Sequence, residues 1–281
     1  MTHPWWLRGA PGRWMLALVF FGLASIGLII PLIVGVLWSL VNPNVGWFPP
    51  AIVPASLSLA NWRAMLSVPE IGQAFVMSFL IAPLVTVLCS ALALPTGYAL
   101  GRRRLRMRRT IELLVLAPII LPGIVLATGL GSMFIRLGLS HTIPGVVLVQ
   151  TVVLLPFMIR IVAATFEGVP QDLIDAGRNL GASPWALTRH VLIPLVKPGL
   201  FAGGLFTFIG SLEEFVLTFI VGMPHVQTLP VLLWAYLGGR SSIFTYAAVV
   251  TMVLLVPTIL LMFIAERTLR QEYLAAGFGK V

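Results

Sequence analysis

Six long apolar segments, separated by shorter polar stretches, dominate this chain of 281 residues. Each is long enough for a helix of about 20 residues to cross the hydrocarbon core of a bilayer. Their approximate bounds are 14–40, 71–100, 111–138, 143–166, 199–221 and 243–265. The pattern predicts an all-α, polytopic membrane protein with six transmembrane helices. Because the first segment far exceeds the roughly 7–15 residues of a signal-peptide core, we expect it to be retained as a span.

Between the fourth and fifth apolar segments lies a polar stretch, residues 167–198, which contains residues typical of the starts and ends of two short helices. Gly181 suits the left-handed position just after the end of the first helix. Ser183 suits the N-cap of the second helix, with Pro184 in its first turn. Pro194 then marks an end or a kink. We therefore expect a helical hairpin with its bend at Gly181.

Composition supports a membrane protein and excludes other classes. Hydrophobic residues make up 59% of the chain and charged residues 10%, with a mean hydropathy of +1.02. A soluble domain carries about 25% charged residues, so this chain lacks the polar side chains to cover a soluble core. The single cysteine, Cys89, excludes an intramolecular disulfide framework. The histidines lack metal-ligand spacing, so no metal site is expected.

The basic residues are distributed very unevenly over the loops. With the N-terminus in the cytoplasm, only Arg63, Arg136 and Arg240 of the 18 basic residues fall on the outer side. The positive-inside rule therefore predicts that both termini and the hairpin are cytoplasmic. We interpret the run GRRRLRMRR at 101–109 as a cytoplasmic turn held to anionic lipid headgroups, with a nucleic-acid patch as the alternative.

The longest predicted outer loop, residues 42–70, is rich in proline and tryptophan. Its last part, LSLANWRAMLSV, has the spacing of a short amphipathic helix. Such a segment would place Trp47 and Trp62 at headgroup depth. An interfacial anchor and a contact for an outer partner protein both explain this loop.

Two adjacent acids, Glu213 and Glu214, lie inside the fifth predicted span. A charge at the bilayer centre costs roughly 2.5–3.5 kcal/mol on insertion scales, so such residues usually face a bundle interior or an aqueous path. Neighbours on a helix point about 100° apart, so the two cannot face one line. Both are candidate substrate-pathway residues. An ion pair with a partner permease, or a protonated and hydrogen-bonded acid, is the alternative.

Prolines should interrupt the third predicted span. Pro118, Pro122 and Gly123 lie close together in it, and they should kink or locally unwind the helix.

The hairpin resembles the EAA motif of the permease subunits of ABC importers, E-A-A-x3-G-x9-I-x-L-P. The spacing is met throughout, with Asp for Glu, Gly for the second Ala, Val for Ile and Ile for Leu. The matching residues are Asp175, Ala176, Gly177, Gly181, Val191, Ile193 and Pro194. The resemblance implies that these residues, together with Ser183, form the ATPase-coupling site of a type I, MetI-like fold.

The same resemblance implies the domain organisation and the partners. A single permease domain would span 14–266, with its coupling region at 167–198, between cytoplasmic tails 1–13 and 267–281. The implied partners are a cytoplasmic ABC ATPase dimer, a second permease subunit, usually a different chain, and a periplasmic or lipid-anchored substrate-binding protein. The chain has no G-x-x-x-x-G-K-[ST] loop, so we expect it to bind no cofactor, with ATP and Mg²⁺ on the ATPase. The implied location is the bacterial inner membrane.

Three further segments resemble the spermidine/putrescine permease branch: APIILPGIVLATGL at 117–130, GSLEEFVLTFIVG at 210–222 and TLPVLLWAYLGG at 228–239. They imply a polyamine substrate, while iron, thiamine, opines and aminophosphonates, carried by neighbours in that branch, stay open. An ion-coupled secondary transporter is the alternative of another class, although no repeated halves are evident. An enzyme is not expected, because the chain contains neither H-E-x-x-H nor G-x-S-x-G.

Overall fold

The computed structural model describes residues 11–103, 105–238 and 244–277. Within these ranges every regular element is a helix, and one isolated antiparallel bridge joins Val41 to Leu57. The prediction of an all-α protein is confirmed. In chain order the elements are α1 (Pro11–Ser39), α2 (Ala60–Leu66), α3 (Pro69–Arg102), α4 (Arg108–Ile120), α5 (Gly123–Arg136), α6 (Ile143–Glu167), α7 (Gln171–Asn179), α8 (Pro184–Leu187), the π-helical turn η2 (Thr188–Leu192), α9 (Ile193–Glu213), α10 (Val216–Gly222), α11 (Leu229–Gly238) and α12 (Phe244–Gly277).

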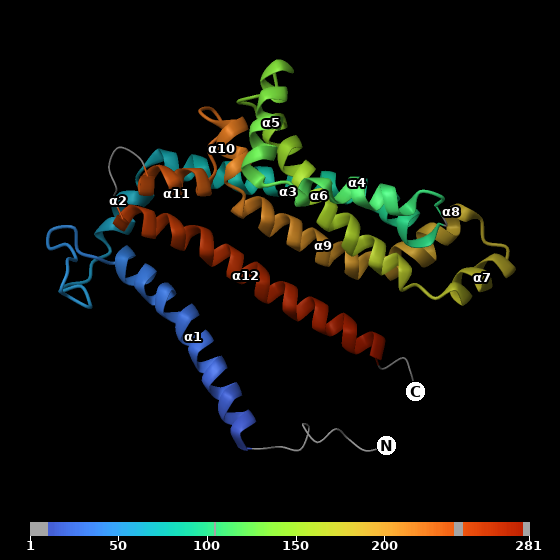
Figure 1. The fold of residues 1–281 in the computed structure, drawn as a ribbon, viewed down its shortest axis with the longest axis horizontal. Helices are drawn as coiled ribbons and strands as arrows, with labels where there is room; N and C mark the ends of the chain where they lie inside the picture. Colours follow the sequence, from blue (N-terminus) through green and yellow to red (C-terminus); the bar gives the residue numbers. More distant parts are fainter. Residues whose placement is uncertain (1–10, 104, 239–243, 278–281) are drawn as a thin grey trace.

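Five helical stretches of the described chain are long and apolar enough to cross a membrane, and one bent pair brings the number to six. The bent pair is α4 with α5, which meet at 98°. In Figure 1, α3, α6 and α9 run alongside one another, and α5 and α10 stand together above them. The five stretches are Leu18–Ser39, Pro69–Arg102, Ile143–Glu167, Pro184–Glu213 and Phe244–Ile264.

The third predicted span is interrupted where the sequence indicates. α4 ends at Ile120 and α5 begins at Gly123, with Leu121 and Pro122 extended between them (ψ 138° and 130°). Pro122 has no N–H for the helical ladder and restricts the residue before it to extended geometry. The predicted kink is therefore confirmed, as a complete break.

The fifth predicted span, 199–221, is wrong as a single helix. A continuous helical stretch runs from Pro184 to Glu213 and stops there, because Glu214 adopts an extended backbone (φ −68°, ψ 122°). The separate short helix α10 follows, and α11 adds a further apolar helix. Hydropathy stays high on both sides of Glu214, so it could not locate this break.

Of the two outcomes predicted at Pro194, an end or a kink of the helix, the end is wrong. The turn just before it, η2, is π-helical, and the helical stretch continues to Glu213. A proline lacks an N–H and would clash with the carbonyl four residues earlier, which here belongs to His190. The wider π turn accommodates the proline within one continuous helix.

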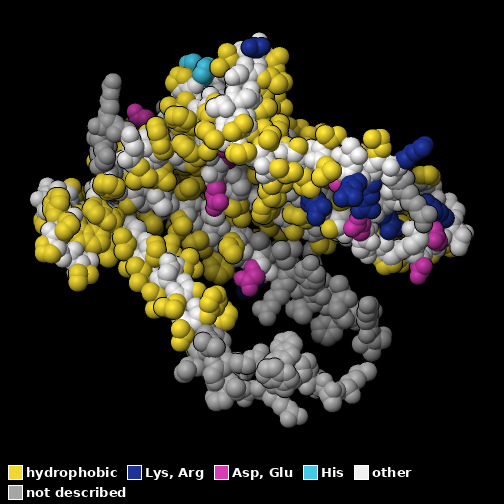
Figure 2. Space-filling view, viewed as in Figure 1, with side chains coloured by type: hydrophobic (Ala, Val, Ile, Leu, Met, Phe, Trp, Pro, Cys, Tyr) yellow, Lys and Arg dark blue, Asp and Glu magenta, His cyan; other side chains and the backbone are white. Residues whose placement is uncertain are grey.

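The surface is largely apolar, as expected of a protein solvated by lipid. Figure 2 shows hydrophobic side chains over most of the body, with Lys and Arg gathered around α4, α7 and α8 at one end. α1 packs mainly on α12, and the two diverge from the bundle (Figure 1). Large side chains of α1, such as Phe20 (68% exposed), face outward along its length.

The segment between α1 and α3 is tied to the end of α1. The short amphipathic helix predicted here is confirmed as α2. The Trp62 indole N–H donates to the Ser39 hydroxyl (3.3 Å), and the Asn61 amide donates to the Val41 carbonyl (2.6 Å). The Trp47 ring lies 4.9 Å from that of Trp38. These internal contacts suit the anchor interpretation, and the partner-contact alternative stays a prediction.

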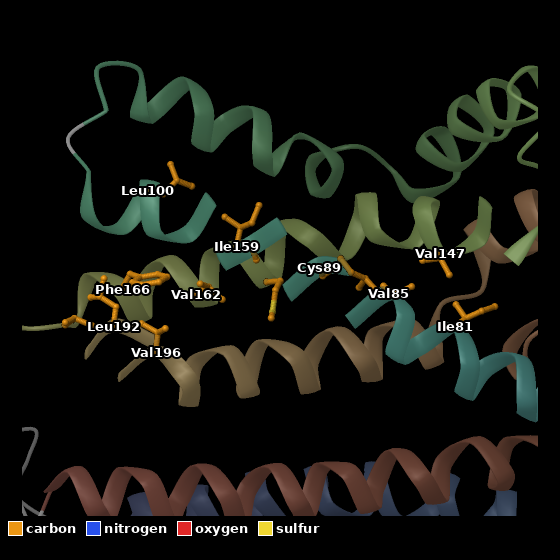
Figure 3. Packing of buried hydrophobic residues seen from close by; sticks show 14 of the residues in the cluster. Ile81, Val85, Cys89, Leu100, Val147, Ile159, Val162, Phe166, Leu192 and Val196 are labelled. Carbon is orange, nitrogen blue, oxygen red and sulfur yellow. The ribbon is translucent and has the colours of Figure 1, made fainter. Parts of the chain in front are cut away.

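The main core lies between α3, α6 and α9. Figure 3 shows its side chains spread along the bundle, with Val85 and Cys89 of α3 toward one end and Val162 of α6 near Val196 of α9 toward the other. Cys89 is completely buried. This core is continuous from the middle of the bundle to the base of the hairpin.

Candidate functional site

The polar stretch folds as a helical hairpin whose bend lies at Gly181. The Ala182 N–H donates to the Gly177 carbonyl (3.0 Å), and the Gly181 N–H donates to the Arg178 carbonyl (2.9 Å). These two bonds form a Schellman motif, which closes a helix with a left-handed residue. Gly181 has φ +80°, a conformation that a residue without Cβ adopts at no steric cost. The predicted bend is confirmed.

The second arm starts with the predicted cap and closes against the first arm. The Ser183 hydroxyl accepts a hydrogen bond from the Ala186 N–H (3.2 Å), with Pro184 in the first turn. Leu187 packs against Gly177, where a Cβ would lie 3.0 Å from the leucine Cδ2. The glycine that replaces the second alanine of the motif therefore suits the close approach of the two arms.

The inner face of the hairpin belongs to the main core. Ile174 from α7, Leu187 from α8 and Leu192 from η2 are all buried in the cluster that also contains α3 and α6. Val191 packs on its edge, whereas Ile193 and Pro194 are exposed. A displacement of the hairpin therefore acts directly on packed side chains of the bundle.

The outer face presents apolar side chains at the tip of a polar element. Leu180 is 88% exposed and Trp185 is 68% exposed. The acid of the motif, Asp175, accepts hydrogen bonds from Arg178 (3.3 Å) and Gln171 (3.1 Å). Exposed aromatic and aliphatic side chains with a polar rim are typical of protein-docking surfaces.

An arginine at the end of α3 fastens the start of the hairpin. The Arg102 guanidinium donates to the Val169 carbonyl (2.8 Å) and to the Gln171 side chain (2.9 Å). Sequence reasoning missed this contact, because Val169 and Gln171 both lie more than 60 residues after Arg102 in the chain. The only signal was that Arg102 belongs to the basic run at 101–109.

The two adjacent acids at the end of α9 have different environments. Glu214 turns back onto α10, and its carboxylate accepts from the Leu217 N–H (2.7 Å), the Thr218 N–H (2.9 Å) and the Thr218 hydroxyl (2.7 Å). Glu213 is exposed, and no hydrogen bond or ion pair to it exists among the described residues. Of the two, only Glu213 is free for a solute or a partner chain.

A buried chain of polar groups continues from Glu214 into α6. The Gln150 amide donates to the Thr218 hydroxyl (2.9 Å), and the Ser211 hydroxyl donates to the Gln150 carbonyl oxygen. Gln150 and Thr218 have no exposed surface. Sequence reasoning missed Gln150, whose only signal is one amide inside an apolar segment.

The hairpin and the acids are separate sites. The residues of the EAA-like motif gather at one end of α9, and the acids lie at its other end. With a rise of 1.5 Å per residue, the helix from Ile193 to Glu213 separates them by about 30 Å. A link between them has to run through α9 and its packing.

Comparison with known proteins agrees with this architecture. A family model described as "Binding-protein-dependent transport system inner membrane component" matches residues 7–271. The probable molybdenum ABC transporter permease of Haloferax volcanii is 34% identical, over 61% of this chain and 67% of that protein. The sulfoquinovosyl glycerol transport system permease of Agrobacterium fabrum is 28% identical, over 83% and 80%. The trehalose transport system permease of Mycobacterium tuberculosis is 27% identical, over 77% and 80%.

Solved structures share the fold. A chain of a bacterial ABC transporter involved in the import of the acidic polysaccharide alginate superposes with a TM-score of 0.74 at 18% identity, covering 94% of this chain and 99% of that one. A chain of the MetNI methionine ABC transporter in an inward-facing conformation gives a TM-score of 0.59 at 23% identity, covering 74% and 97%. The predicted ABC-permease fold and the location in the inner membrane, with several spans, are confirmed. This chain belongs to the family of binding-protein-dependent transport system inner membrane components, the permease subunits of ABC transporters.

Proposed function

We propose that this chain forms half of the substrate pathway of an ATP-driven importer and that its hairpin couples this pathway to a separate ATPase. The observation that carries the proposal is the two-faced hairpin. Its tip exposes Leu180 and Trp185, while its inner face, with Ile174 and Leu187, is part of the bundle core. A partner bound at the tip would therefore act on the packing of α3, α6 and α9.

The partners follow from the family and from the chain itself. The sequence has no phosphate-binding loop of the G-x-x-x-x-G-K-[ST] type, so ATP and Mg²⁺ would bind to a dimeric ABC ATPase. A second permease would complete the pathway. A substrate-binding protein would deliver the solute, as supported by the solved alginate transporter in complex with a pentasaccharide-bound periplasmic protein.

The mechanism would be alternating access. ATP binding closes the ATPase dimer and draws the hairpins together, and the spans rock between inward-open and outward-open states. Arg102 would help transmit the movement, because it joins the end of α3 to Val169 and Gln171 at the base of the hairpin.

Two observations favour different classes of substrate. A polyamine is supported by one structural feature, the free carboxylate of Glu213, which suits a cation. The relatives described above are named for molybdenum, sulfoquinovosyl glycerol and trehalose, and these names favour an uncharged or anionic solute instead. Substrate-stimulated ATPase activity of the reconstituted complex, measured across a polyamine, a disaccharide and molybdate, decides between them.

Gly181→Glu tests the coupling role. A side chain at φ +80° is strained, so the bend should be lost and the ATPase should no longer co-purify. Gly138→Glu is the matched control, because Gly138 has φ +68° and open space around it but lies in the loop after α5. Full ATPase retention in the Gly181 variant, with normal membrane abundance, would argue against docking at the hairpin.

A further inference from the structure

A cleft of about 220 Å³ opens between α3, α4 and α6, and no residue of the hairpin lines it. Leu100 and Ile159, which lie on the faces of α3 and α6 turned toward α4 (Figure 3), line it. Its wall is otherwise formed by Val115, Leu116, Ala163 and Ala164, and its charged groups are Arg108, Glu112, Arg160 and Glu167. The cleft thus combines an apolar wall with charged groups from two helices.

Three of the four charges in the cleft satisfy one another. The Arg108 guanidinium pairs with Glu112 (2.8 Å) and with Glu167. This triad joins the start of α4 to the end of α6. Arg160 is exposed, and its guanidinium takes part in no hydrogen bond or ion pair with any residue that the structure describes.

The position of Arg160 makes an unpaired charge costly. It lies inside the apolar span Ile143–Glu167, seven residues before the end of that helix. At 1.5 Å per residue, this places its Cα about 10 Å in from the helix end. Arginine within a span usually pairs with another group or extends its side chain toward the headgroup region. A partner for its guanidinium, either a headgroup or another chain, would therefore lie outside the described chain.

We propose that this cleft binds one anionic phospholipid, with its phosphate on the Arg160 guanidinium. A guanidinium presents a planar pair of donors that matches two phosphate oxygens. The apolar wall suits the glycerol backbone and the start of an acyl chain, which favours a lipid over free phosphate. Basic pockets between spans on the cytoplasmic side are known binding sites for anionic headgroups.

The surrounding charge favours an anionic lipid over a zwitterionic one. Arg103 and Arg106 are exposed in the segment that leads into α4, and Arg109 is exposed in its first turn, next to Arg108. Each basic side chain near the membrane surface adds to the attraction between the protein and an anionic leaflet. The basic run therefore enriches anionic lipid at the mouth of the cleft, and Arg160 would hold one molecule inside it.

The test is native mass spectrometry of the assembled transporter, purified in mild detergent and supplied with phosphatidylglycerol. The wild-type complex should retain one phosphatidylglycerol. Arg160→Gln should lower its occupancy about tenfold, the loss expected for one charge-assisted contact, and Arg160→Lys should restore part of it. Arg136→Gln, at an exposed arginine in the last turn of α5, should change nothing.

A second variant keeps Arg160 and removes the space. Ala164→Trp fills the apolar wall without altering the charge, and it should displace the lipid to the same extent. Phosphatidylglycerol retention equal to the wild type in both variants overturns the proposal. So does loss of the second permease from the Arg160→Gln complex with the lipid still bound, because the arginine would then pair with an acid of that subunit. Binding of phosphatidylcholine as tight as that of phosphatidylglycerol would overturn the anionic selectivity.

Discussion

The hairpin and the break between α9 and α10 are both polar interruptions of an apolar chain. Their polar groups differ in where they lie: those at the break are bonded inside the protein, and those at the hairpin stay on its surface. At the break, the Glu214 carboxylate accepts hydrogen bonds from backbone N–H groups of the following helix, α10, and Gln150, Thr218 and Ser211 extend the buried chain of polar groups. At the hairpin, the charges stay on the surface and Trp185 is exposed beside them. The hairpin is therefore marked as a contact site by the apolar side chains exposed beside its charges, and polarity alone does not distinguish it from the break.

The same contrast holds for the two adjacent acids. Glu214 is bound by three donors of α10, whereas Glu213 is exposed and has no partner among the residues that the structure describes. We therefore assign Glu214 a structural role and keep Glu213 as the candidate pathway residue. Substitutions at these two positions should separate stability from transport.

The largest effect is expected for Glu214→Ala. Removal of the carboxylate leaves two N–H groups of α10 and the Thr218 hydroxyl without their acceptor, and each unsatisfied buried donor costs about 1–3 kcal/mol. We expect a marked fall in the thermal unfolding temperature of the purified complex and a loss of transport for every substrate. A variant with wild-type stability would show that the Glu214 carboxylate does not stabilise the break between α9 and α10.

A smaller and selective effect is expected for Glu213→Gln. An exposed side chain contributes little to folding, so the unfolding temperature and the membrane abundance should stay unchanged. If the substrate is a polyamine, its uptake should fall about tenfold, the value of one lost charge-assisted contact. Unchanged uptake of every transported cation would contradict the proposal that Glu213 lines the substrate pathway.

The smallest effect is expected for Asp175→Asn, at the acid of the EAA-like motif. Asp175 pairs with Arg178 at 3.3 Å, both side chains are more than half exposed, and exposed pairs contribute about 0–1 kcal/mol. The asparagine can still accept from Gln171. We expect ATPase co-purification within about twofold of the wild type. A complete loss would mean that the ATPase contacts this carboxylate directly.

Local signals in the sequence predicted local structure well. Gly181 was found because a Schellman motif needs only neighbours in the chain, and Pro122 because its missing N–H acts on its own helix. The break at Glu214 was missed, since hydropathy does not register a carboxylate that accepts hydrogen bonds from the first turn of the following helix. The link from Arg102 to Val169 and the pair Gln150–Thr218 could not be predicted either, because they join segments more than 60 residues apart.

The most direct test of the coupling hairpin is the accessibility of its tip. In Trp185→Cys, a membrane-impermeant maleimide should label the new cysteine, while the buried Cys89 gives little background. We expect rapid labelling in inside-out vesicles stripped of the ATPase and strong protection after the ATPase is added back. Met107→Cys, in the predicted cytoplasmic turn before α4 and 62% exposed in the wild type, is the control on the same side of the membrane that should show no protection. Equal labelling of Trp185→Cys with and without the ATPase would contradict docking at the hairpin tip.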